Sequence, residues 1–149
     1  MLLLCCAVAS AAIPQPGRFD GLTSQPYPDG SRGTVTITMT GGGQTIHRFN
    51  ITWLAGCDNG FMALSQGTRA EGSLDRRGRF KGAGTYFSET GNLAGTGYTA
   101  TIRNRLRGRF VGERRVRGTF RATAVMRDLN GQPVSTCASP VIRWSAARG

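Results

Sequence analysis

Residues 98–127 read YTATIRNRLRGRFVGERRVRGTFRATAVMR, and this stretch decides the fold. From residue 115 onward the even positions are apolar or small, and the odd positions between them are mainly arginine and threonine. Alternation with a period of two over a dozen residues predicts a strand with one buried face. The run 98–110 alternates in the same way and assigns to the core Tyr98, Ala100, Ile102, Leu106 and Phe110. We therefore predict two long strands, joined around residues 111–114, that share an apolar face and carry arginines on the other.

Shorter runs of the same kind fill most of the remaining chain. In one of them Val35, Ile37 and Met39 alternate with threonines. No segment shows a 3.6-residue period with helix caps. We expect strands at 17–24, 34–40, 46–54, 61–64, 79–81, 85–87, 98–110, 115–127 and 134–146, with weak pairing at 69–74. About eight to ten short antiparallel strands predict an all-β domain, either a β-sandwich or an open or closed β-barrel.

The first residues predict an export signal. A short apolar run ends at Val8, and the small residues ASAA follow it at cleavage spacing. The run has no positive charge before it and is too short to span a bilayer, which a truncated start would explain; a buried first strand is the alternative. We expect a signal peptide at 1–12, a linker at 13–16 and a single β domain at 17–149 of a secreted, extracellular protein.

Removal of such a leader would leave two cysteines, Cys57 and Cys137. In an oxidising compartment, an isolated pair in a small β domain most simply forms one disulfide. The bridge would close a loop of about 80 residues, which the chain-entropy model values at roughly 4 kcal/mol. A metal site is the alternative, but two cysteines and the single His47 are too few ligands at unsuitable spacing. We expect no metal and no cofactor.

Four stretches carry a resemblance to known proteins: GRFDGLTSQ, RGRFKG, RLRGRFVGERRVRGTFRATA and CASPVIRWSAAR. They resemble the G-x-F-x-G-x-T-S-Q start, the basic G-x-F-x-G hairpin and the C-terminal Cys-to-W-x-A segment of a group of small secreted actinobacterial β-rich proteins of unknown function. The resemblance covers most of the chain after the leader. It implies a compact β domain with a Cys57–Cys137 bridge, and it implies little about activity. The turn after Cys137 departs from the glycine-containing turn of that group.

No catalytic motif is present, and we expect no enzyme. His47 lies on the inward parity of its strand, where a structural role is favoured over that of a general base. No G-x-S-x-G and no phosphate-cradling loop occurs. The carboxylates fall mostly in turns, where Asp bonds the backbone, and they are Asp20, Asp29, Asp58, Glu71, Asp75, Glu89, Glu113 and Asp128. Two of them could still meet as a hydrolase pair. Trp53 and Trp144 have inward parity and are assigned to the core rather than to a sugar platform.

Arginines make up all but one of the 19 basic residues in a chain of net charge +11. A GC-rich codon usage would produce this excess without any function, whereas selected anion binding would give it a purpose. If the two long strands pair, one face carries Arg103, Arg105, Arg107, Arg109, Arg115, Arg117 and Arg121. Guanidinium groups suit phosphate by bidentate geometry. The rows lack exposed aromatics that would stack bases, so we expect no dedicated nucleic-acid motif.

These patterns predict a secreted, monomeric, non-catalytic β domain that binds anionic cell-wall or membrane-surface polymers through the seven arginines. Two alternatives stay open: a small extracellular hydrolase with a carboxylate site, and a structural module without a ligand. Carboxylates that converge in a concave site would favour the hydrolase. A continuous arginine surface would favour binding, and arginines scattered around the domain would favour the ligandless module.

Overall fold

The computed structural model describes residues 13–60, 62–68, 72–88 and 97–149, so the expected signal peptide lies outside the described residues. Most of the described chain lies in β-strands, and it contains one 3-10 turn, η1 (Gly41–Gly43). The strands are β1 (Gly17–Pro26), β2 (Arg32–Thr40), β3 (Thr45–Cys57), β4 (Met62–Thr68), β5 (Gly72–Ser73), β6 (Arg79–Ser88), β7 (Thr99–Phe110), β8 (Arg115–Arg127), β9 (Pro133–Ala138) and β10 (Ile142–Ala147).

The two long strands form as the alternation predicts. Strands β7 and β8 pair antiparallel along their whole length, and residues 111–114 connect them. Their register places Leu106 opposite Phe120 and Ile102 opposite Ala124, and all four side chains are buried. A shared register of this kind is required once one face of both strands is buried, because a shift by one residue would expose every apolar side chain.

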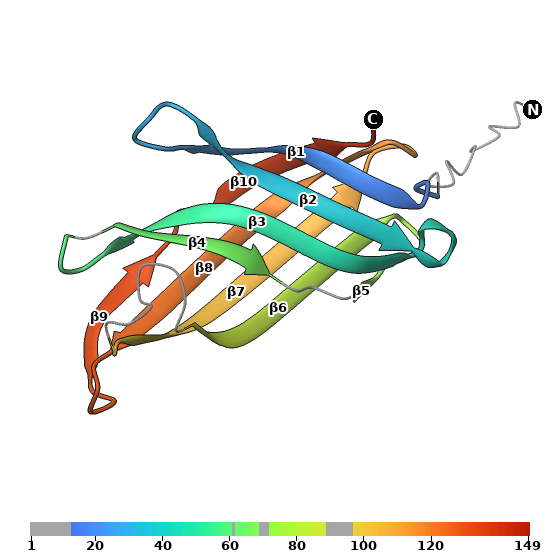
Figure 1. Ribbon diagram of the computed structural model, residues 1–149. Coiled ribbons are helices and arrows are strands. Elements are labelled where there is room, and N and C mark those ends of the chain that lie inside the picture. The colour runs from blue at the N-terminus through green and yellow to red at the C-terminus, as the bar shows by residue number, and fades with distance from the viewer. Residues whose placement is uncertain (1–12, 61, 69–71, 89–96) are drawn as a thin grey trace, which may run out of the picture.

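The sheet closes into a six-stranded antiparallel barrel in the order β10, β1, β2, β3, β9 and β8, because β10 also pairs with β8. Strands β7 and β6 continue the sheet from β8, and β4 and β5 pair with β3. In Figure 1, β1 to β4 form one wall, which crosses in front of the wall made by β6 to β9. The all-β prediction is confirmed, with a barrel as the architecture.

One continuous core fills the space between the walls. Phe19, Phe49, Trp53 and Phe120 are at most 1% exposed, and Trp144 is 3% exposed. The Phe49 and Trp144 rings meet edge to face with their centroids 5.3 Å apart, which is a geometry that aromatic quadrupoles favour. The assignment of both tryptophans to the core is confirmed.

Two glycines allow the Phe80 and Trp144 rings to lie close to the backbone of the sheet. Gly108 of β7 and Gly118 of β8 lie opposite each other. A Cβ atom at Gly108 would overlap the Phe80 ring, and one at Gly118 would overlap the Arg107 carbonyl oxygen and the Trp144 ring. Only glycine therefore allows these rings to lie directly against the backbone.

Two of the expected segments divide differently in the structure, and several strands also extend beyond their expected ends. The expected pieces at 79–81 and 85–87 are one strand, β6, because pairing with β7 continues across the intervening glycines. The expected last strand at 134–146 is two strands, β9 and β10, which pair with successive parts of β8. Pro140, which has no N–H to donate, lies in the break, and the Ser139 hydroxyl there accepts a 2.9 Å hydrogen bond from the Ala122 N–H.

Two side chains predicted to point inward are exposed. His47 points outward because the pairing of β2 with β3 shifts between Thr38 and Met39, which changes the parity after the buried Ile46. A bulge of this kind has no signature in the alternation itself. Tyr98 precedes β7 and is 41% exposed, so its assignment to the core was wrong. Residues 61 and 69–71, which fall in the expected segments 61–64 and 69–74, lie outside the described residues.

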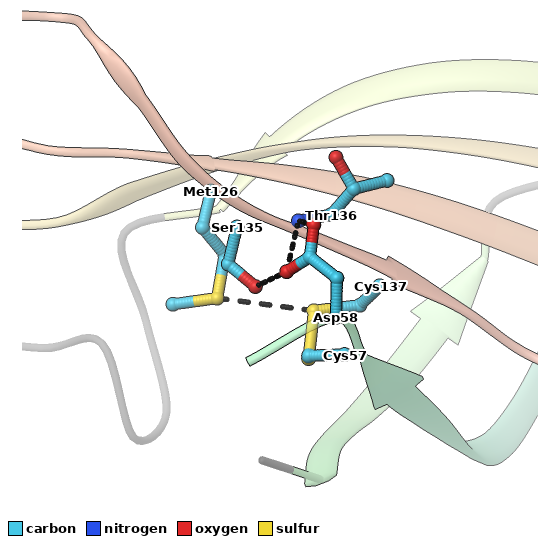
Figure 2. The surroundings of a disulfide bond; sticks show 6 residues. All are labelled: Cys57, Asp58, Met126, Ser135, Thr136 and Cys137. Carbon is cyan, nitrogen blue, oxygen red and sulfur yellow. Dashed lines mark hydrogen bonds between the residues drawn. A yellow bond between two sulfur atoms is a disulfide. The ribbon is translucent and has the colours of Figure 1, made fainter. Parts of the chain in front are cut away.

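The expected disulfide between Cys57 and Cys137 is present and joins β3 to β9 at directly paired positions. Figure 2 shows how polar contacts support this junction. The Ser135 hydroxyl donates to Asp58 Oδ1 at 2.7 Å, and the Thr136 N–H donates to Asp58 Oδ2 at 3.1 Å. These hydrogen bonds hold the pKa of Asp58 below its usual value. The Met126 sulfur lies 3.9 Å from the Cys137 sulfur.

Candidate anion-binding groove

The structure places the seven predicted arginines together on the outside of the barrel. Each of them is exposed, and each alternates with an inward residue of β7 or β8. Arg105 lies directly opposite Arg121, and Arg109 lies directly opposite Arg117. The predicted double row is therefore a single surface rather than two separate edges.

Neighbouring strands extend this surface in both directions. In β6, Arg79 pairs with Arg109 and Lys81 with Arg107, and in β10 Arg143 pairs with Thr119. Strands β6, β7, β8 and β10 contain no Asp or Glu. We call their outward cations the arginine face: Arg79, Lys81, Arg103, Arg105, Arg107, Arg109, Arg115, Arg117, Arg121 and Arg143.

The charges on the arginine face are almost uncompensated. Among the described residues, one ion pair reaches it, from Arg79 Nε to Asp75 Oδ2 at 2.8 Å. Backbone and side-chain hydrogen bonds from Arg79 hold the pKa of Asp75 below its usual value. Like charges opposite each other across a strand pair cost about 0.2–1 kcal/mol each. The folded protein therefore maintains an unfavourable charge arrangement that an anion would relieve.

A groove crosses the arginine face at right angles to the strands. It has a volume of about 770 Å³ and is lined by six arginines without a carboxylate. The register explains its direction, because Arg79, Arg109, Arg117, Ser145 and Leu22 follow one another across β6, β7, β8, β10 and β1. The Arg143 N–H donates a 3.0 Å hydrogen bond to the Ser24 hydroxyl, which joins β10 to β1 at the edge of the groove. The six arginines are Arg32, Arg79, Arg107, Arg109, Arg117 and Arg143.

Three of the six arginines that line the groove were predicted from the sequence. Arg107, Arg109 and Arg117 belong to the predicted set and line it, whereas Arg103, Arg105, Arg115 and Arg121 lie on the same face outside its lining. Arg32, Arg79 and Arg143 were missed because their strands reach the groove only through long-range pairing. A signal existed for Arg143, since it lies between the inward residues Ile142 and Trp144.

The described carboxylates have structural partners instead of converging in a cleft. Asp29, Asp75 and Asp128 each accept backbone hydrogen bonds within their own turns, as expected for Asp in turns. Glu113 accepts a hydrogen bond from Gln15. Glu71 and Glu89 lie outside the described residues. The part of the chain that the structure describes thus brings no carboxylate pair into the groove.

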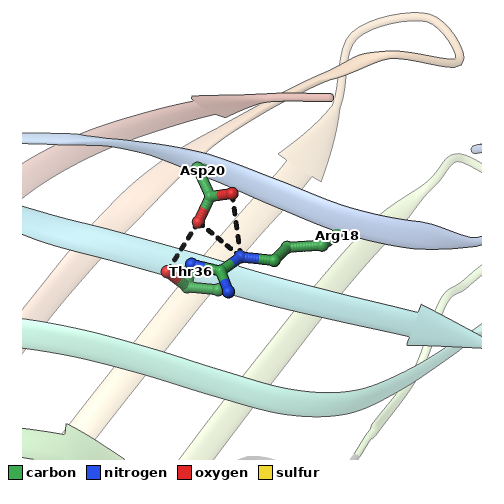
Figure 3. A network of polar contacts seen from close by, with 3 residues as sticks. All are labelled: Arg18, Asp20 and Thr36. Atoms are coloured by element: carbon green, nitrogen blue, oxygen red, sulfur yellow. Dashed lines mark hydrogen bonds and ion pairs between the residues drawn. The ribbon is translucent and has the colours of Figure 1, made fainter. Parts of the chain in front are cut away.

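Besides Asp75, which pairs with Arg79, Asp20 is a described carboxylate near the groove, two residues before the lining residue Leu22. Its oxygens accept hydrogen bonds from Arg18 Nε at 2.8 and 2.9 Å and from the Thr36 hydroxyl at 2.9 Å (Figure 3). Desolvation acts to raise the pKa of Asp20, but the Arg18 and Thr36 hydrogen bonds outweigh it and hold the pKa below its usual value. Asp20 is therefore ionised and locally neutralised at neutral pH.

Residues 13–60, 62–68, 72–88 and 97–149 contain no group of three or more His, Cys, Asp or Glu side chains that could hold a metal ion. Within the same residues, no helix is long and apolar enough to cross a membrane. Comparisons of the chain with models of protein families, with curated proteins and with solved structures found no match.

Proposed function

We propose that this protein is a secreted, non-catalytic β domain that associates with phosphate-bearing anionic material of the cell envelope through the arginine face. The observation that carries the proposal is the groove, which gathers six guanidinium groups and no carboxylate. Guanidinium groups bind phosphate oxygens in pairs of parallel hydrogen bonds, so several of them around one hollow suit a phosphate-bearing ligand.

The distribution of charge supports selected binding over codon usage. A codon bias would raise arginine at outward positions of every strand. The outward positions of β2 between its ends are instead Thr34, Thr36 and Thr38, whereas those of β7 are mostly arginine. The Cys57–Cys137 disulfide supports an oxidising location outside the cytoplasm.

The test is co-sedimentation of the protein with a bacterial envelope fraction across a salt series, before and after removal of phosphate with cold hydrofluoric acid. We expect binding that requires phosphate and falls steeply with salt, because each neutralised phosphate releases counterions. The triple variant Arg107→Gln, Arg117→Gln, Arg143→Gln should bind at least about tenfold more weakly, with a smaller salt slope.

The matched control neutralises three arginines outside the groove, Arg48→Gln, Arg76→Gln and Arg77→Gln, which removes the same charge. It should lose less than about threefold in affinity. Equal losses for the two triple variants would contradict the proposal, as would binding that survives removal of phosphate. Either result would favour a module whose charge has no specific ligand.

A further inference from the structure

A second hollow adjoins the groove. It has a volume of about 540 Å³ and shares Leu22, Arg117 and Ser145 with the groove, so the two form one continuous depression. Its lining combines small and apolar residues with Arg115 and Arg117, and its exposed large apolar side chains are Leu22 and Val111. The depression thus presents guanidinium groups beside exposed hydrocarbon.

Two apolar side chains of the second hollow are exposed. Leu22 is 54% exposed and Val111 is 48% exposed. Leu22 occupies an outward position of β1, and Val111 follows the end of β7. Single exposed apolar residues are common, but these two line the same hollow beside Arg115 and Arg117.

The charge at the junction suits an anion that adjoins an apolar group. Arg117 lines both the groove and the second hollow, and Arg115 adds a second positive charge to the second hollow. Asp20 also lines the second hollow, but the hydrogen bonds from Arg18 and Thr36 already satisfy its carboxylate. The charge of the Asp20 carboxylate is therefore already balanced by Arg18 when an anionic group binds at Arg117.

We infer that the depression binds a lipid phosphate, with its phosphate group at Arg109 and Arg117 and the first carbons of its apolar chain against Leu22 and Val111. This inference rests on the proposed function and names the class of phosphate compound that the groove takes. An entirely polar phosphate polymer would bind the arginines and leave Leu22 and Val111 exposed.

The test compares two soluble probes by isothermal titration calorimetry: glycerol 3-phosphate and dihexanoylphosphatidic acid below its micellar concentration. We expect the lipid phosphate to bind at least about tenfold more tightly, since burial of roughly 55 Å² of apolar surface suffices for that factor. Val111→Asn, which changes a residue outside the groove lining, should remove most of this gain and leave the affinity for inorganic polyphosphate unchanged.

Val134→Asn is the matched control, because Val134 is 46% exposed and lines neither hollow. It should keep the full preference for the lipid phosphate. Equal affinity for the two probes, or a preference that survives Val111→Asn, would overturn the inference. If polyphosphate still bound through Arg117, the proposed function would stand without it, whereas loss of all phosphate binding would remove both.

Discussion

The two walls of this barrel follow the same alternation but carry different chemistry on their outer faces. The arginine face lies on β6, β7, β8 and β10, and the opposite wall presents what we call the threonine face: Thr34, Thr36, Thr38, Asn50 and Thr52 of β2 and β3. Both walls bury equally apolar inner faces. Because folding needs only the inner pattern, the outer arginines are not a requirement of the fold.

Three threonines of the threonine face, Thr34, Thr36 and Thr52, form hydrogen bonds within their own wall. The Thr34 N–H donates to the Thr52 hydroxyl at 2.6 Å, and Thr36 and Arg18 together bind Asp20. On the arginine face, Arg105 and Arg109 instead lie opposite Arg121 and Arg117. The comparison indicates that polar groups of one wall bond to each other, whereas cations of the other wall face one another across paired strands.

Loss of the disulfide is the largest expected effect, because this bond ties the strand β3 of the threonine face to β9, which pairs with β8. The variant Cys57→Ser with Cys137→Ser should lose about 4 kcal/mol of unfolding free energy, as expected for a loop of this length. Urea unfolding monitored by tryptophan fluorescence and by circular dichroism measures it. Two separate transitions would show that the walls unfold independently, contrary to the single core described above.

Gly118→Val probes the thin sheet under the arginine face. The new side chain would overlap the Trp144 ring and the Arg107 carbonyl oxygen, which should cost about 1–3 kcal/mol, or more if the strands shift. The control is Gly56→Val in β3, where a Cβ atom meets nothing within 4 Å. Thermal unfolding should show a much larger decrease in melting temperature for Gly118→Val than for Gly56→Val. Similar melting temperatures would contradict the close approach at Gly118.

Removal of one arginine from each wall should change stability in opposite directions. Arg117→Thr relieves repulsion with Arg109 and should stabilise the free protein by about 0.2–1 kcal/mol at low salt. Arg18→Thr removes the exposed ion pair with Asp20 and should destabilise it slightly. Denaturant titrations at low and high salt measure both effects, which salt should shrink. A destabilising effect of Arg117→Thr would contradict the claim that Arg117 and Arg109 repel each other in the folded protein.

The smallest effect concerns acid pH. The pKa values of Asp20, Asp29, Asp58 and Asp75 are all lowered in the folded protein. Their contribution to stability is therefore complete above the unfolded value of 3.8 and is lost as pH falls through the folded values below it. Melting temperature measured between pH 6 and pH 2 should fall in the lower part of this range. Asp58→Asn should reduce the slope, and an unchanged slope would contradict the role of the Ser135 and Thr136 hydrogen bonds.

The sequence predicts the local features of this molecule well, because the alternation of β7 and β8 depends only on neighbouring residues. It does not predict closure of the barrel, which requires β10 to pair with β8. For the same reason Arg79 and Arg143 could not be assigned to the groove, since their positions depend on register across strands distant in sequence. His47 was misplaced because a bulge reverses parity without changing composition.

The most direct test of the account moves charge from one face to the other at constant net charge. One variant carries Arg107→Gln and Arg117→Gln, and a second adds Thr40→Arg and Asn50→Arg on exposed positions of the opposite wall. Affinity for long-chain polyphosphate is measured for both across a salt series. We predict that the second variant stays at least about fivefold weaker than the unmodified protein, because the groove and not the total charge binds the anion. Recovery of full affinity in the second variant would contradict that claim.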